Sequence, residues 1–142
     1  MGLTGIIVNA TIQLLPIRSS SILQKTIKAD CIEAACEAFE SNSDATYSVA
    51  WIDCLSKEKS LGRSVIMLGE HAAQGGLDID IRQKVSVPFS TPSALLNSVT
   101  MKAFNAAYWH KSKNNESQTV TLMPYFYPLD AIGAWNRLYG KK

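Results

Sequence analysis

The chain has 142 residues, of which 46% are hydrophobic and 18% are charged, and its formal net charge is +2. This length is sufficient for one domain with a core of its own. The small net charge argues against nucleic-acid binding, and no apolar run reaches the ~18 residues that a membrane span needs. The three cysteines form no CxxC pair, which indicates free thiols in a reducing compartment rather than a metal site.

Apolar and polar residues alternate over residues 8–14, which predicts a first strand with one solvated face in an antiparallel sheet. Pro16 ends this pattern. A first helix is predicted next, because Asp30 and Glu33 have the spacing of a capping box. Its apolar stripe follows the spacing i, i+3, i+4, i+7 and consists of Ile32, Ala35, Cys36 and Phe39.

Residues 47–53 and 63–71 are predicted to form two further strands, joined by a polar, lysine-bearing link. In the first of these strands, Tyr47, Val49 and Trp51 share one face. The following stretch, residues 72–90, has weak periodicity and is expected to form a long excursion.

The second half of the chain predicts a helix, a strand and a short terminal helix. Thr91 and Pro92 indicate the N-terminus of the longer helix. The apolar side of this helix consists of Leu95, Leu96, Val99, Ala103 and Ala106. A fourth strand is predicted over residues 118–127, and Asp130 is expected to cap the last helix.

The resulting order is strand, helix, strand, strand, helix, strand. It predicts a single α+β domain in which helices pack on one face of an antiparallel sheet. This is the βαββαβ arrangement of ferredoxin-like domains.

The sequence contains no self-contained catalytic motif. GxSxG, GxGxxG and HExxH are absent, as is a phosphate-binding glycine loop. His71 and His110 are candidate bases, although a lone histidine beside apolar residues is more often structural. Asp78 and Asp80 are interpreted as a solvated edge rather than a carboxylate pair. The aromatic stretch PYFYPLDAIGAWNRLYGKK, residues 124–142, is the more informative feature.

Three stretches resemble a known family. They are LTGIIVNATIQLLPI (residues 3–17), YSVAWIDCLSKEKSLGRSVIMLGEHA (residues 47–72) and YFYPLDAIGAWNRLYGKK (residues 125–142). They resemble the FAD-linked oxidases of the vanillyl-alcohol-oxidase type, and among these the decaprenylphosphoryl-β-D-ribose 2′-oxidase-like enzymes. Aldonolactone oxidases belong to the same group. Residues 72–113 resemble the family only loosely.

The resemblance implies that residues 1–142 are part of a substrate-binding cap domain, and that the flavin-binding domain lies in segments outside this chain. FAD would then be bound mainly outside the chain, and this fragment alone would be inactive. A cytoplasmic parent protein is expected, in keeping with free thiols in a reducing compartment, and association of the parent with a membrane is left open. The aromatic terminal stretch would be a pocket wall and lid.

The resemblance also implies which residues belong to the substrate pocket. Trp51 matches the family's pocket tryptophan, and Val49 lies two residues before it on the same face. Phe126 falls where the decaprenyl-type enzymes have a tyrosine, so this position lacks the hydroxyl group of the family. The flexible segment over the pocket mouth matches Leu129, Ile132 and Trp135. Asp53 and Arg63 match as well and are interpreted as structural, so no catalytic residue is assigned.

Two functions follow as hypotheses. In the first, the parent oxidises a hydroxyl of a sugar or glycolipid-like substrate by hydride transfer to flavin. Its partners would be a small-molecule or lipid-linked sugar and the rest of the flavoenzyme, with no nucleic acid. In the alternative, the chain is a free-standing α+β binding module with an aromatic surface for a protein or ligand. Self-association is expected for the isolated chain, because an incomplete cap leaves a sheet edge unpaired.

Overall fold

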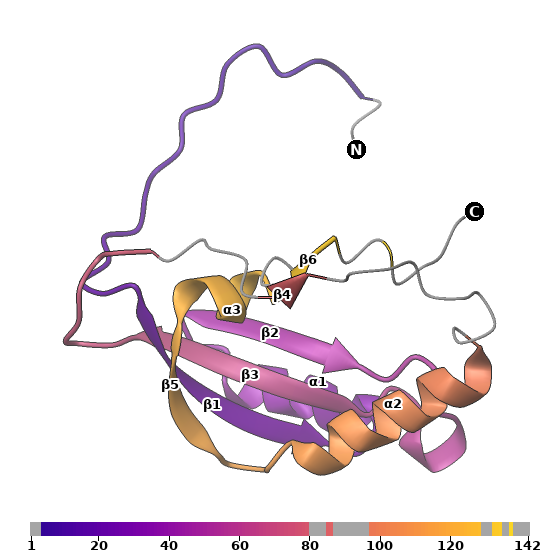
Figure 1. Cartoon of the computed structure of the whole chain (residues 1–142). Helices are drawn as coiled ribbons and strands as arrows, with labels where there is room; N and C mark the ends of the chain where they lie inside the picture. Colours follow the sequence, from indigo (N-terminus) through magenta and orange to yellow (C-terminus); the bar gives the residue numbers. More distant parts are fainter. Residues whose placement is uncertain (1–3, 80–84, 87–96, 129–131, 135–136, 138–142) are drawn as a thin grey trace.

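The computed structural model describes residues 4–79, 85–86, 97–128, 132–134 and 137. A four-stranded antiparallel sheet in the order β2-β3-β1-β5 forms its centre (Figure 1). Its strands are β1 (Ser21–Ala29), β2 (Tyr47–Ile52), β3 (Ser64–His71) and β5 (Ser117–Thr121). The helices are α1 (Ile32–Ser41), the 3-10 turn η1 (Glu58–Ser60), α2 (Ser98–Lys111) and α3 (Leu122–Phe126). The short strands β4 (Val85–Ser86) and β6 (Ile132–Gly133) pair in parallel. These elements confirm the α+β class.

The two long helices lie on opposite faces of the sheet. On the α1 side, the buried core consists of Ala29, Ala35, Ile66 and Leu68. On the other side, Tyr108 of α2 contacts Trp51, whose partner across the ladder is Val65. Val65 and Ile66 are neighbours on β3, so their side chains point to opposite faces of the sheet. Because Ile66 lies in the core beside α1 and Val65 pairs with Trp51 beside α2, the two helices lie on different faces (Figure 1).

This arrangement differs from the prediction of helices on one face, and a ferredoxin-like topology is not confirmed. The physical reason lies in the side chains that α2 buries. Val99 and Ala103, expected to face inward, are exposed, whereas Asn105 and Trp109 are buried. The helix is therefore held by polar and aromatic contacts at the strand ends rather than by an aliphatic stripe.

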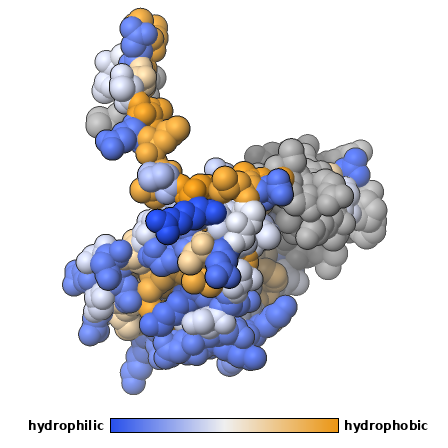
Figure 2. All heavy atoms as spheres, turned by 90° about the vertical axis from the view of Figure 1, so that its left-hand side faces the viewer, coloured by the Kyte–Doolittle hydropathy of each residue, from blue (hydrophilic) through white to orange (hydrophobic). Residues whose placement is uncertain are grey.

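The first strand of the sheet is β1, which sequence reasoning missed, and the strand predicted over residues 8–14 is wrong. In β1, Ile22, Gln24 and Thr26 are buried at alternate positions, and the strand pairs with both β3 and β5. Residues 4–17, called the N-terminal arm below, have no regular secondary structure and project from the body (Figures 1 and 2). A strand needs a partner for its backbone groups, and no described strand pairs with the arm.

β2 and β3 confirm the two strands predicted in the middle of the chain, with ends shifted by one residue. α1 confirms the first helix. Its N-cap is Cys31, which forms no side-chain cap, so Asp30 does not begin a capping box. The helix is held at this end by the hydrogen bond from the Ile32 amide to the Leu61 carbonyl, at 2.9 Å.

The C-terminal half differs more from the sequence-based prediction. α2 begins after Asn97, whose side chain accepts hydrogen bonds from the amides of Val99 and Thr100 at 2.8 and 3.0 Å. Thr91 and Pro92 lie outside the described residues, as does Asp130. The predicted fourth strand is shorter than expected, because it ends at Thr121 and residues 122–126 form α3.

Tyr125 attaches α3 to the sheet. It is only 5% exposed, and its hydroxyl donates to the carbonyl oxygens of Met67 at 2.8 Å and Tyr47 at 3.3 Å. Its ring lies over Gly69, where an added Cβ would be 2.6 Å from Cζ of Tyr125 and 2.9 Å from Cγ2 of Ile22. The missing side chain of Gly69 therefore makes room for the tyrosine ring.

We predict that Gly69→Ala lowers the free energy of unfolding by about 1–3 kcal/mol, because the added methyl group overpacks the Tyr125 site. Urea unfolding followed by circular dichroism measures this change. Gly76→Ala is the matched control, because its added Cβ would have no neighbour closer than 3.6 Å. Equal stabilities of the two variants would contradict this account of the packing.

Asp53 connects the end of β2, the start of β3 and α2. It is 2% exposed. One oxygen, Oδ2, accepts hydrogen bonds from Nε and Nη2 of Arg63 at 2.9 and 2.7 Å. The other, Oδ1, accepts from the Leu55 amide at 3.0 Å and from the Asn105 side chain at 2.6 Å. This arrangement supports the structural role assigned to Asp53 and Arg63.

The same contacts set the charge of Asp53. Burial acts to raise the pKa of Asp53, but the hydrogen bonds from Leu55, Arg63 and Asn105 and the charge of Arg63 outweigh it, so the pKa lies below its usual value. The carboxylate is therefore ionised at neutral pH. Each of its partners donates to a negative charge, which makes these hydrogen bonds stronger than neutral ones.

We predict that Asp53→Asn destabilises the fold by about 2–4 kcal/mol at pH 7, because Arg63 loses its anion and the hydrogen bonds lose their charge. Glu116→Gln is the control. It removes the exposed Lys113–Glu116 pair, whose atoms are 3.6 Å apart, and should cost less than about 1 kcal/mol.

The pH dependence follows from the lowered pKa of Asp53. The stability that the carboxylate contributes is present above its unfolded-state pKa of about 3.9 and is lost as the pH falls through the lower folded-state value. Unfolding measured from pH 7 downward should therefore show a smaller loss below about pH 4 in Asp53→Asn than in the wild type. If the free energies of unfolding of the two proteins fall in parallel as the pH is lowered, Asp53 is not the source of the pH dependence.

Candidate functional site

The face of the sheet opposite α1 carries the side chains that the sequence assigned to a substrate pocket on β2. Tyr47, Val49 and Trp51 occupy alternate positions of this strand and are half-buried. Their position on one face is confirmed by the register with β3. We call this surface the aromatic face; it consists of Tyr47, Val49, Trp51, Val65 and Met67.

Aromatic contacts mark both ends of the aromatic face. At one end, the ring centroids of Trp51 and Tyr108 are 4.7 Å apart. Burial raises the pKa of Tyr108, which therefore keeps its proton at neutral pH. At the other end, the centroids of Tyr47 and Phe126 are 4.9 Å apart in an edge-to-face arrangement. Val49 lies between these ends, so the face is apolar in the middle and bounded by rings.

His71 holds the Tyr47 end in place. Its Nδ1 lies 2.7 Å from the carbonyl oxygen of Ser19, which can only accept, so Nδ1 carries the proton. In the neutral imidazole, Nε2 then accepts from the Tyr47 hydroxyl at 3.1 Å. Both ring nitrogens are thus occupied within the chain, which favours the structural interpretation of His71 over a role as catalytic base. His110 is exposed on α2.

The hydroxyl of Tyr125 is also unsuited to proton transfer. Burial and the nearby charge of Glu70 raise the pKa of Tyr125 to about 12. Its hydrogen bonds to backbone carbonyls require the neutral phenol. The residue therefore acts as a permanent donor that positions α3 and, with it, Phe126.

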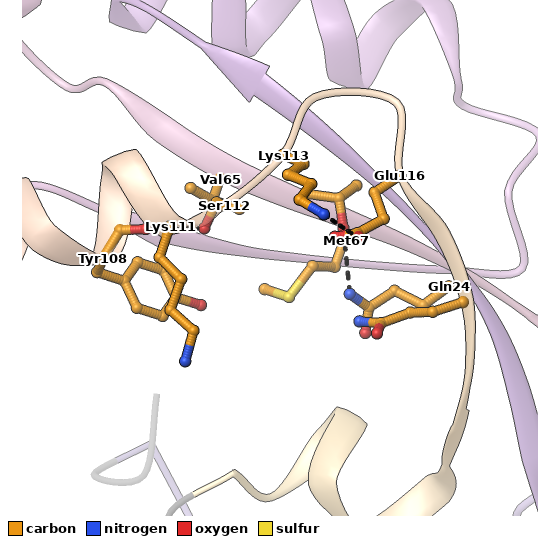
Figure 3. Close-up of a pocket in the computed structure, with 10 residues that line it drawn as sticks. Gln24, Val65, Met67, Tyr108, Lys111, Ser112, Lys113 and Glu116 are labelled. Atoms are coloured by element: carbon orange, nitrogen blue, oxygen red, sulfur yellow. Dashed lines mark hydrogen bonds and ion pairs between the residues drawn. The ribbon is translucent and has the colours of Figure 1, made fainter.

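A cleft of about 300 Å³ adjoins the aromatic face where α2 ends (Figure 3). Its lining residues are Gln24, Thr26, Val65, Met67, Tyr108, Lys111, Ser112, Lys113, Glu116 and Gln118. Val65 and Met67 belong to the aromatic face as well, so the two surfaces are continuous. Gln24 Nε2 donates to Thr26 Oγ1 at 3.2 Å, and this buried pair forms the polar side of the cleft. Such a mixture of amide, hydroxyl and apolar groups suits a ligand that carries hydroxyl groups.

Sequence reasoning missed the residues of this cleft. The available signal was the alternation of Ile22, Gln24 and Thr26 in residues 21–29, a strand pattern with polar residues on the buried side. Tyr108 and Lys111 lie on a side of α2 for which the sequence shows no periodic pattern of apolar residues. Their proximity to β1 depends on the placement of the helix.

The structure tests the positions of only some of the predicted pocket residues. Val49 and Trp51 are together on β2, and Phe126 on α3 reaches the aromatic face through Tyr47. Ile132 belongs to the backbone of β6. Leu129 and Trp135 lie outside the described residues.

Three further properties of the described ranges concern metals, thiols and membranes. No group of three or more His, Cys, Asp or Glu side chains could hold a metal ion there. Cys31, Cys36 and Cys54 are free thiols. Among the helices that can be described, none combines the length and apolar character needed to cross a bilayer.

Two comparisons with known proteins bear on the identity of the chain. No protein-family model matches it. Over 150 aligned residues it is 31% identical to decaprenylphosphoryl-beta-D-ribose oxidase of Mycolicibacterium smegmatis, which covers 98% of this chain and 33% of the relative. It is also 27% identical over 111 residues to an uncharacterized protein in the mprA 5′ region of Streptomyces coelicolor, covering 70% of this chain and 29% of that protein.

The chain thus spans about a third of the length of the curated relatives that it matches. The first similarity confirms the resemblance seen in the three sequence stretches. Over nearly its whole length, the chain is similar to part of an oxidoreductase, a decaprenylphosphoryl-β-D-ribose oxidase.

Proposed function

We propose that residues 1–142 form part of the substrate-binding cap of an FAD-dependent oxidoreductase that oxidises a hydroxyl of a sugar or glycolipid-like substrate. The observation that carries this proposal is the aromatic face, with Tyr47, Val49 and Trp51 aligned on β2. The similarity to a ribose oxidase supports the same assignment.

The geometry suggests how the chain would hold a sugar. A pyranose or furanose ring has C–H faces that pack against aromatic rings. Trp51 and the neighbouring Val49 would provide such a wall, and the adjoining cleft with Gln24 would receive hydroxyl groups. Phe126 at the Tyr47 end has no hydroxyl of its own, so it would contribute only apolar contact. In this proposal Leu129, Ile132 and Trp135 belong to the segment at the pocket mouth.

The described residues do not fit a complete FAD site. A pyrophosphate needs a glycine-rich turn whose amides point at the ligand. The Gly75–Gly76 turn instead closes on its own chain, since the Gly76 carbonyl accepts hydrogen bonds from the amide and hydroxyl of Ser20 at 2.9 and 3.1 Å. FAD would therefore be bound mainly by other segments of the parent, and the redox chemistry would belong to that cofactor.

A second function, that of a free-standing binding module, is favoured by one specific contact. Trp51 is already covered in part by Tyr108 of α2 within this chain. If that packing is intrinsic, Trp51 contributes to the fold, and the rest of the aromatic face is a surface for a protein or ligand. The two functions predict different effects of removing the Trp51 side chain. A cap would lose catalytic efficiency, whereas a binding module would lose stability.

We predict that this chain alone does not bind FAD with micromolar affinity, because the described residues contain no pyrophosphate cradle. The measurement is quenching of flavin fluorescence on titration with the purified chain, with isothermal calorimetry as a second readout. Stoichiometric binding would contradict the assignment of FAD to other segments.

We predict that Trp51→Ala in the longer protein lowers kcat/KM about ten- to a hundredfold, or roughly 1.4–2.7 kcal/mol of transition-state contact, with flavin content nearly unchanged. Steady-state kinetics and flavin absorbance provide these values. Trp109→Ala is the matched control. Trp109 is 8% exposed in the interior, beside Lys28, so its loss should cost about 3–5 kcal/mol of stability.

The comparison of the two tryptophans separates the candidate functions. A large loss of kcat/KM at Trp51 with an unchanged Tm supports the cap. If Trp51→Ala lowers the Tm as much as Trp109→Ala, Trp51 is a core residue and the binding-module hypothesis is favoured.

A further inference from the structure

The central strand buries a polar pair on the side of the sheet that carries the cleft. β1 is flanked by β3 and β5, and its alternate residues Ile22, Gln24 and Thr26 are 0%, 8% and 6% exposed. A buried amide or hydroxyl costs free energy that an aliphatic side chain at the same position does not. The polar pair therefore indicates a binding role at this point of the sheet.

The hydrogen bonds of Gln24 leave one donor and the oxygen of its amide available. A glutamine amide has two N–H donors and one acceptor oxygen. Within the described residues, Nε2 donates to Thr26 Oγ1 at 3.2 Å and no hydrogen bond engages Oε1. Because no buried side-chain nitrogen or oxygen in that part of the chain lacks a partner, Oε1 is accessible from the cleft that Gln24 lines. Figure 3 shows the amide directed toward Met67.

Gln118 supplies a second amide beside the first. It is the partner of Gln24 across the ladder between β1 and β5. Directly opposed residues share one face of the sheet, with Cβ atoms about 4.5–5.5 Å apart. Gln118 lines the same cleft and is exposed, and its side chain forms no hydrogen bond to the rest of the described chain. Two neighbouring amides are thus available to one ligand.

Two amides side by side match a vicinal diol. A hydroxyl group both donates and accepts, so each hydroxyl of a diol can accept from an N–H and donate to an amide oxygen. A carboxylate or phosphate only accepts and would leave both amide oxygens without a donor. Val65 and Met67 line the cleft as well and offer apolar contact to ring carbons. The cleft therefore suits a neutral sugar ring.

This pair of amides lies apart from the wall that Trp51 forms. Trp51 pairs with Val65, and Gln24 pairs with Gly69. Val65 and Gly69 are four positions apart on β3, which corresponds to about 13 Å along the strand. This separation exceeds one sugar ring, so a substrate that reaches both places extends beyond a single ring.

We propose that Gln24 and Gln118 bind the vicinal diol of a second sugar unit in the substrate, with the carbons of that ring against Met67. The proposal rests on the proposed function, because it takes the ligand to be a sugar. It assigns the two amides to recognition and not to proton transfer, since a side-chain amide has no titratable proton near neutral pH.

The test is the binding of two probe sugars to the full chain, followed by NMR of the glutamine side-chain amides. Methyl β-D-ribofuranoside has a vicinal diol, and methyl 2-deoxy-β-D-ribofuranoside has none. The first should shift the amide signals of Gln24 and Gln118 and bind about three- to tenfold more tightly, which corresponds to one net hydrogen bond. Gln118→Leu should remove this preference. Its thermal unfolding should match the wild type, because position 118 is exposed.

Thr119→Val is the matched control. Thr119 is the next residue of β5 and does not line the cleft, because neighbouring residues of a strand point to opposite faces. The substitution removes an exposed hydroxyl and should leave both dissociation constants within about twofold.

Saturation-transfer NMR on the longer protein repeats the comparison with the cleft in its full surroundings. The preference for the diol, and its loss in Gln118→Leu, should persist there. Equal binding of the two sugars overturns the proposal, as does a preference that Gln118→Leu leaves intact. Absence of binding in the longer protein, where another segment fills the cleft, also overturns it. A failure of the proposed function appears separately, as an unchanged kcat/KM in Trp51→Ala, since Trp51 does not line the cleft.

Discussion

The arrangement of the structure depends on one buried carboxylate. Asp53 lies at the junction of β2, β3 and α2 and receives hydrogen bonds from Arg63 of the β3 side and Asn105 of the helix. Because a buried charge is costly unless it is fully paired, the two donors have to stay in place. The carboxylate thereby holds α2 against the sheet face that α1 does not cover. The positions of Tyr108 beside Trp51 and of the cleft wall follow from this attachment.

Because α2 is attached to the sheet by polar contacts rather than by aliphatic packing, it leaves part of the sheet face uncovered. If α2 buried a broad apolar stripe, it would cover the sheet face as α1 covers the other. Instead its contacts concentrate at the strand ends, through Asn105, Tyr108 and Trp109. The middle of the aromatic face, with Val49 and Met67, stays only half-buried. A sheet face that is bounded by rings and incompletely covered is the type of surface that binds an apolar or sugar ring.

In the proposed function, this chain contributes to substrate binding, and FAD held by other segments of the parent carries the chemistry. The described residues supply walls, hydrogen-bond donors and a cleft, while the titratable groups of His71, Tyr125 and Asp53 are committed to structural roles. His71 bonds to Ser19 and Tyr47, Tyr125 bonds to backbone carbonyls, and Asp53 is paired. Such a division suits a protein whose similarity covers about a third of a larger oxidoreductase.

The sequence by itself determined the α+β class, the two central strands with Tyr47, Val49 and Trp51 on one face, the first helix and the resemblance to the oxidases. These features depend on local periodicity, which each segment carries within itself. The strand predicted over residues 8–14 has an equally clear alternation, yet it lacks a partner, while residues 21–29 form the central strand although their buried side includes Gln24 and Thr26. Alternation indicates which residues can form a strand, but the hydrogen bonds that make it one come from neighbours distant in sequence. Tertiary structure likewise decided the face on which α2 packs, because the partners of Asn105 and Tyr108 lie about 50 residues away in Asp53 and Trp51, and no local pattern encodes such contacts.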